Sequence, residues 1–234
     1  MIPAPARDVD ATAFEDLGRA TLQIVHDLKN QLNGLKLYAT FLRKRLERDD
    51  QAVEERETLL KLIAGLDRAA KDMTALVRYA RPMDLRPHAQ VDLRSIIMSV
   101  IDEAAARGTG GLSPTRIASE IAAEPLLGEF DPTALTEAFK AVTDDVRASA
   151  AKQADRLSLN AQRTAHEQID GATIEWRGGK LTARTRTFPT TRGCGTVHTA
   201  LAAKIIEAHG GSLTCEGDVI RAWLPISNSP NREK

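Results

Sequence analysis

The stretch LKNQLNGLKLYATFLRKRL, residues 28–46, decides the fold of the first part of the chain. Its apolar residues recur at alternating intervals of four and three, which is the a/d pattern of a helix that packs along a seam. The helical pattern extends back to about residue 11 and on to residue 48, and no proline interrupts it. We therefore predict a long helix over 11–48. Its inward seam is Leu28, Leu32, Leu35, Ala39, Leu42 and Leu46.

A second helical pattern follows directly after Asp49-Asp50 and runs from about residue 52 to residue 80. Arg81-Pro82 ends it, because the residue before a proline is driven out of the α region. Two long helices joined by a tight turn form an antiparallel hairpin, and each apolar stripe is too long to be covered within one chain. We therefore expect a homodimer in which two hairpins pair as a four-helix bundle.

The rest of the chain changes character. Helical patterns alternate with strand-like and glycine-rich segments, Asp131-Pro132 marks the start of a helix, and Gly210-Gly211 marks the end of another. These features predict an α+β domain with helices on one face of a mixed sheet. The expected segments are a disordered lead (1–10), the helical hairpin (11–82), a linker (83–90), the α+β domain (91–226) and a polar tail (227–234).

Composition argues against several classes of protein. The 32 Lys+Arg balance 32 Asp+Glu, so a sequence-independent nucleic-acid binder and a polybasic membrane-surface protein are not expected. No stretch reaches the roughly 18 apolar residues of a membrane span, and no basic and apolar secretory leader is evident. Two cysteines are too few for a disulfide framework, and a reducing cytosol is the simplest interpretation. We expect a cytoplasmic protein.

His26 is the most informative residue of the first helix. It lies about 160° from the seam, so its imidazole faces outward, with Asn30 and Asn33 on the same face. Imidazole is available as a neutral nitrogen nucleophile near pH 7, and the neighbouring Asp27 could hold one ring nitrogen as N–H. This arrangement suits phosphoryl transfer. The alternative is an ordinary surface histidine on a structural bundle.

The string IVHDLKNQLNGL, residues 24–35, resembles the H-box of sensor histidine kinases. In that family a phospho-accepting histidine is followed by an acidic residue and, four positions after the histidine, by Asn or Thr. The end of the second helix and Val91-Asp92-Leu93 are also similar to the family. Gln31 departs from its usual proline, from which we expect a straighter helix with the same chemistry.

The second half is similar to the ATP-binding domain of these kinases, a Bergerat or HATPase-like sandwich, most clearly at KIIEAHGGSL, residues 204–213. The ATP motifs are eroded. Ala141 and Asp145 align with the family's metal-binding asparagines, and Trp176 with its adenine-binding aspartate. Residues 193–198, GCGTVH, depart from the glycine-rich lid. The resemblance therefore implies a domain that binds neither ATP nor a metal or other cofactor.

Taken as a whole, the resemblance implies a dimeric histidine phosphotransferase of a phosphorelay. It would relay phosphoryl groups between response-regulator receiver domains without ATP, with Mg²⁺ on the receiver. His26 would carry the phosphoryl group, and Asp27 would orient or deprotonate the His26 imidazole. Asn30 would assist hydrolysis of the phosphorylated partner. The residues expected to contact the receiver are Lys29, Asn33, Leu37 and Phe41. For Leu37 and Phe41, packing against the second domain of the dimer is an equal alternative.

Two other functions stay open on the sequence alone. A sensor-less histidine kinase, or a regulator phosphatase, with an atypical ATP site would bind Mg–ATP tightly. A non-catalytic pseudokinase adaptor dimer would keep its biological function without His26. The direction of phosphoryl flow is not fixed by any motif.

Overall fold

The computed structural model describes residues 25, 28–44, 46, 53–106, 117–150, 157–166, 168–178 and 196–227. The chain divides into two compact units, Met1–Arg81 and Pro82–Lys234, and each is described by itself. Within the described ranges, no helix has both the length and the apolar character needed to cross a membrane.

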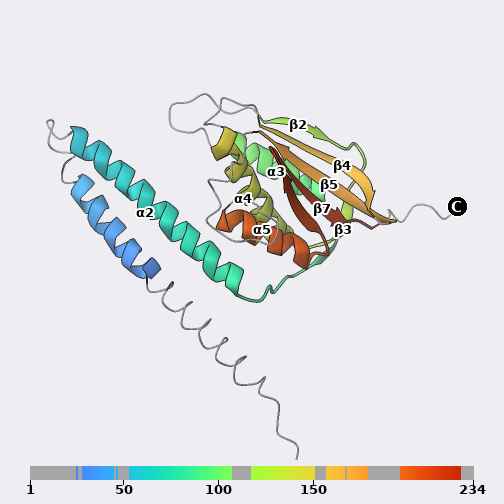
Figure 1. Ribbon diagram of the computed structural model, residues 1–234, viewed down its shortest axis with the longest axis horizontal. Coiled ribbons are helices and arrows are strands. Elements are labelled where there is room, and N and C mark those ends of the chain that lie inside the picture. Colours follow the sequence, from blue (N-terminus) through green and yellow to red (C-terminus); the bar gives the residue numbers. More distant parts are fainter. Residues whose placement is uncertain are drawn as a thin grey trace, which may run out of the picture. The chain divides into compact units, whose positions relative to one another are not determined.

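The first unit is helical in its described part. Residues 28–44 form one helix, and α2 (Val53–Ala80) lies beside it (Figure 1). An ion pair joins the two, with Lys36 Nζ 2.5 Å from Asp67 Oδ1. Ala39, from the middle of the predicted seam, is buried. The two helical stretches predicted from the apolar periodicity are therefore helical wherever the structure describes them.

The second unit contains a five-stranded mixed sheet and, on one face of it, the described helices α3, α4 and α5 (Figure 1). The strand order is β2-β4-β5-β7-β6, with β2 parallel to β4 and the other neighbours antiparallel. The helices are α3 (Leu93–Ala106), α4 (Pro132–Ala150) and α5 (Val197–Ala208). The strands are β2 (Ala118–Ile121), β4 (Ser158–His166), β5 (Ile169–Arg177), β6 (Ser212–Glu216) and β7 (Val219–Pro225). The predicted mixed α/β architecture is confirmed.

Alternation along the strands decides which face of the sheet is buried, because successive side chains of a strand point to opposite faces. In β5, Ala172, Ile174 and Trp176 are buried, whereas Thr173 and Glu175 are partly exposed. The buried face packs against the helices, with α4 against β5 and α5 against β6 and β7. The helices contribute the fully buried Leu93, Ile97, Leu135, Phe139, Ile205 and Ile206.

The predicted start of α4 and end of α5 are both observed. Asp131 Oδ1 accepts hydrogen bonds from the backbone N–H groups of Thr133 and Ala134, each at 3.0 Å, which is an N-cap directly before Pro132. After α5, Gly210 has φ +76°. A Cβ on Gly211 would lie 2.2 Å from the carbonyl oxygen of Trp223, so only glycine fits there.

Two features differ from the sequence expectations. A two-stranded sheet forms between β1 (His88–Asp92) and β3 (Leu127–Phe130), and β1 takes in the end of the segment interpreted as a linker. Cys215 in β6 is disulfide-bonded, whereas the cysteine count predicted no disulfide framework.

Candidate functional site

The polar part of the predicted reactive face is only partly described. His26 and Asp27 lie outside the described residues. Asn30 and Asn33 are exposed on the helix formed by residues 28–44 and share one of its faces, while Lys29, to one side of them, is partly buried. The helix therefore carries two of the predicted site residues to solvent on the face that the sequence assigned to His26.

The same face continues as an apolar surface. Leu37 and Phe41 are exposed to 69% and 66%, as the sequence predicted for them, and Tyr38 beside them is exposed to 70%. Three large apolar side chains at this exposure are unusual for the surface of a soluble helix unless a partner covers them. A separate stripe of half-exposed leucines lies on the seam side of the helix: Leu28, Leu35 and Leu42.

In the second unit, Asp145, which the sequence resemblance aligned with a metal-binding asparagine, has a carboxylate that is already hydrogen-bonded. Asp145 Oδ2 accepts a hydrogen bond from the Thr196 hydroxyl at 2.5 Å and another from the Thr199 hydroxyl. Thr196 is itself the N-cap of α5, and its oxygen accepts from the backbone N–H groups of His198 and Thr199. Asp145 on α4 therefore anchors the first turn of α5.

The environment of Asp145 disfavours its ionised form. Burial is the largest influence and raises the pKa of this carboxyl, and the neighbouring Asp144 adds to the rise. The hydroxyls of Thr196 and Thr199 and the charge of His198 oppose it without cancelling it. The carboxyl of Asp145 is therefore a largely buried group whose Oδ2 is engaged by the first turn of α5.

Replacing Asp145 by asparagine is expected to raise the free energy of unfolding at pH 7 relative to wild type. A folded-state pKa raised above the unfolded value gives stability that is complete below about pH 4 and is lost as pH rises through the folded pKa. Asparagine carries no charge to desolvate, and its amide can hydrogen-bond both threonines. Urea unfolding at pH 4 and pH 7 should show the advantage of the variant growing with pH. The exposed Asp102→Asn is the control, and an advantage independent of pH would contradict the assignment.

Trp176, which the sequence resemblance aligned with the adenine-binding aspartate, is completely buried. Its ring packs edge-on against Phe139, with centroids 5.6 Å apart, and its Nε1–H donates to the buried Thr143 hydroxyl at 2.9 Å. Both partners belong to α4. The indole is therefore a core side chain with its polar atom satisfied, and it points between the sheet and α4 rather than toward solvent.

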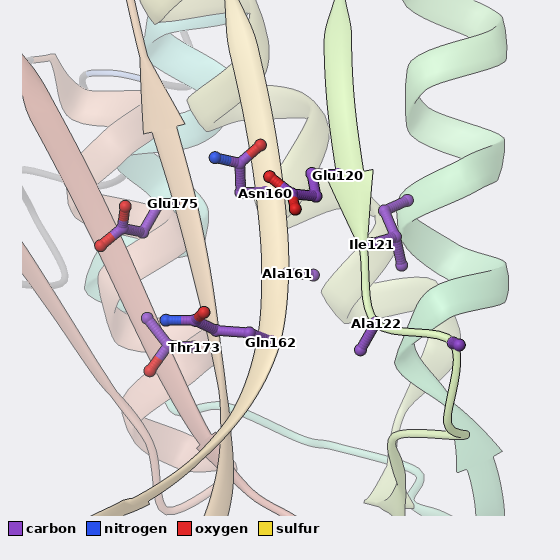
Figure 2. A pocket seen from close by; sticks show the side chains of 9 residues that line it. Glu120, Ile121, Ala122, Asn160, Ala161, Gln162, Thr173 and Glu175 are labelled. Carbon is purple, nitrogen blue, oxygen red and sulfur yellow. The ribbon is translucent and has the colours of Figure 1, made fainter.

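A polar groove that the sequence analysis did not anticipate lies on β2, β4 and β5 (Figure 2). Its volume is about 370 Å³. Asn160 and Gln162 belong to the less buried face of β4, because Leu159 and Ala161 alternate with them into the core. This alternation of apolar and polar residues along β4 was the feature of the sequence from which a polar outer face could have been predicted. The other polar lining residues are Glu120, Thr173 and Glu175.

Polar side chains of the groove are already hydrogen-bonded to neighbouring residues. Both oxygens of Glu175 are occupied: Oε2 accepts from Arg177 and Oε1 from Arg221 at 2.6 Å. These guanidinium groups, Arg177 first, hold the pKa of Glu175 below its usual range. Thr173 shares a hydrogen bond with Thr164. In the part of the chain that the structure describes, no cluster of three or more His, Cys, Asp or Glu side chains could hold a metal ion.

Comparisons with known proteins identify the fold. No protein-family model and no curated protein sequence matches the chain. Among solved structures, the Acinetobacter baumannii histidine kinase AdeS matches with a TM-score of 0.55 and 16% identity, over 82% of this chain and 96% of that one. Full-length ShkA in complex with AMPPNP matches with a TM-score of 0.60 and 17% identity, over 91% of this chain and 47% of that one.

At these identities the likeness shows the fold and not the activity. The chain spans about half the length of ShkA and nearly all of AdeS. The second unit has the mixed α/β architecture of a HATPase-like domain. Within this unit, Trp176 fills a position in the core. The chain therefore has the fold of the histidine kinases, at low sequence identity to them.

Proposed function

We propose that the chain is a histidine phosphotransferase of two-component signalling, which relays phosphoryl groups between receiver domains through His26 without ATP. The observation that carries the proposal is that two side chains of the second domain are already used for internal hydrogen bonds. Two positions that align with nucleotide-binding residues, Asp145 and Trp176, are committed to internal hydrogen bonds with α5 and α4. The likeness of residues 24–35 to an H-box identifies the imidazole of His26 as the reactive group.

The proposed step is a reversible transfer between nitrogen and oxygen. A ring nitrogen of His26 attacks the phosphorus of the receiver's aspartyl phosphate. The N–P bond forms, the P–O bond to the aspartate breaks, and the carboxylate leaves with the electron pair. The other ring nitrogen keeps its proton, held by Asp27. The reverse step on a second receiver restores neutral His26, and Mg²⁺ on each receiver offsets the charge of the transferred group.

The exposed residues of the helical face have roles in this proposal. Asn30 would orient water when the phosphorylated partner is hydrolysed, and Lys29 and Asn33 would contact the acyl phosphate or its surroundings. Leu37 and Phe41, at 69% and 66% exposure, would dock the receiver or pack against the second domain of the dimer.

A homodimer is part of the proposal. The half-exposed leucines Leu28, Leu35 and Leu42 form one stripe on the helix of residues 28–44, because they recur every seven residues. A stripe of leucines at this spacing on a helix is typical of a bundle interior, where further helices cover it. A second copy of the helical pair would complete a four-helix bundle.

A relay experiment tests the proposal. Each receiver domain of the source organism is phosphorylated with radiolabelled acetyl phosphate, freed of the donor, and mixed with the chain. We expect label to move to the chain from one receiver and then to a second, unlabelled receiver. A chain that takes no label from any receiver, while remaining a folded dimer, would contradict the proposal and favour an adaptor.

A further inference from the structure

The first residues of the second unit, predicted from the sequence to be a linker after α2, are held within that unit before the first strand begins. The backbone N–H of Arg86 donates to Asp131 Oδ2 at 2.9 Å, two residues ahead of β1. The other oxygen of the same carboxylate caps α4 through Thr133 and Ala134. Asp131 therefore divides its two oxygens between a helix and the linker.

His209 binds the backbone of Asp131. The backbone N–H of Asp131 donates to Nε2 of His209 at 3.0 Å, so that nitrogen is an acceptor. Nδ1 lies 2.8 Å from the carbonyl oxygen of Ile205 and must carry the proton that it donates there. Both ring nitrogens of a neutral imidazole are thus used. Phe130, which pairs with His88 of β1, packs against the same ring with centroids 6.0 Å apart.

The backbone donors around Asp131 stabilise its carboxylate. The N–H of Ala134 is the largest influence that lowers the pKa of Asp131, and the N–H groups of Arg86 and Thr133 act in the same direction against the opposing effect of burial. The carboxylate is therefore ionised, and able to accept from the linker, at neutral pH.

We propose that Asp131 and His209 form a clasp that fixes the linker at Arg86, and that Asp131 is thereby a positioning residue for phosphoryl transfer at His26. With Arg86 held, only residues 81–85 lie between it and the last residue of α2, Ala80. Six peptide steps span at most about 22 Å when fully extended. A short connection limits the positions that the second domain can take around the reacting histidine. The expected effect on phosphoryl transfer rests on the proposed function. The clasp is independent of that function, because it is defined by hydrogen bonds within the second unit.

Asp131→Asn separates the two tasks of the carboxylate. Asparagine is as good an N-cap as aspartate, so its oxygen continues to cap α4. Its –NH₂ group then faces Arg86 N–H and cannot accept from it. We expect amide hydrogen exchange at Arg86 to accelerate about tenfold, while Thr133 and Ala134 exchange as in wild type. Asp102→Asn, the same charge change at an exposed position of α3, is the control and should leave Arg86 unchanged.

A second readout tests the positioning role. The rate of phosphoryl transfer from a receiver to the chain should fall at least roughly threefold in Asp131→Asn. Arg86→Pro removes the same bond from the linker side, leaves the α4 cap untouched, and should reproduce that loss. Unchanged exchange at Arg86 would overturn the clasp. Faster exchange at Arg86 in Asp131→Asn, together with an unchanged transfer rate in Asp131→Asn and in Arg86→Pro, would overturn the positioning role. A wild-type chain that accepts no phosphoryl group would refute the proposed function, and the exchange result would still decide the clasp.

Discussion

Replacing His26 by glutamine is expected to reduce labelling of the chain by a phosphorylated receiver to background, a loss of at least about a thousandfold. The reason is that the proposed intermediate is a bond between phosphorus and a ring nitrogen, and glutamine offers no nucleophilic nitrogen. The fold should survive, because the sequence places His26 on the outward face of its helix. The measurement is the initial rate of label transfer, with the dimer verified by light scattering.

The matched control is His166→Gln. His166 is an exposed residue of β4, and its substitution makes the same chemical change on the second unit. Labelling of this variant should equal that of wild type. If His26→Gln still accepts label, the phosphoryl group is carried by another residue, and the assignment of the H-box is wrong.

Replacing Trp176 by alanine is expected to cost about 4 kcal/mol of unfolding free energy. The indole is fully buried against Phe139, so its removal leaves a cavity between the sheet and α4, and the buried Thr143 hydroxyl loses its partner. Such a loss is a large fraction of the stability of an ordinary domain. Urea unfolding followed by circular dichroism measures it.

The other tryptophan provides the comparison. Trp223 is only partly buried and lies over Gly171 on the face of the sheet opposite Trp176. Trp223→Ala should cost less than half as much. Trp176→Phe keeps most of the apolar volume and loses the bond to Thr143, which predicts a cost of about 1 kcal/mol. Equal losses for the two alanine variants would contradict the view that Trp176 is a central core residue.

Much of the fold could be predicted because its signals are local. Periodicity and a proline stop set the bounds of α2, Asp131-Pro132 set the start of α4, and a glycine pair set the end of α5. The small sheet could not be predicted in this way. β1 pairs with β3 some 40 residues later, as in His88 with Phe130, and neither strand carries a strong alternating pattern of its own.

In the candidate site too, local features could be predicted from the sequence and features that depend on tertiary packing could not. A helical wheel placed Asn30, Asn33, Leu37 and Phe41 on one exposed face, because that arrangement depends only on spacing along one helix. The partners of Asp145 could not be found from sequence, since Thr196 is 51 residues away and meets it through the packing of α5 on α4. Trp176 was recognised as a departure from the family pattern, but its bond to Thr143 depends on the same tertiary packing.

The most direct test of ATP-independent phosphotransfer is incubation with γ-radiolabelled ATP and Mg²⁺, beside incubation with a labelled receiver. The arrangement of Asp145 and Trp176 predicts no label from ATP on the wild-type chain, together with label from the receiver that is lost in His26→Gln. Label from ATP that depends on His26 would show that the second domain binds nucleotide after all. The chain would then be a histidine kinase, and Asp145 and Trp176 would not be the obstacles to nucleotide binding that their internal hydrogen bonds indicate.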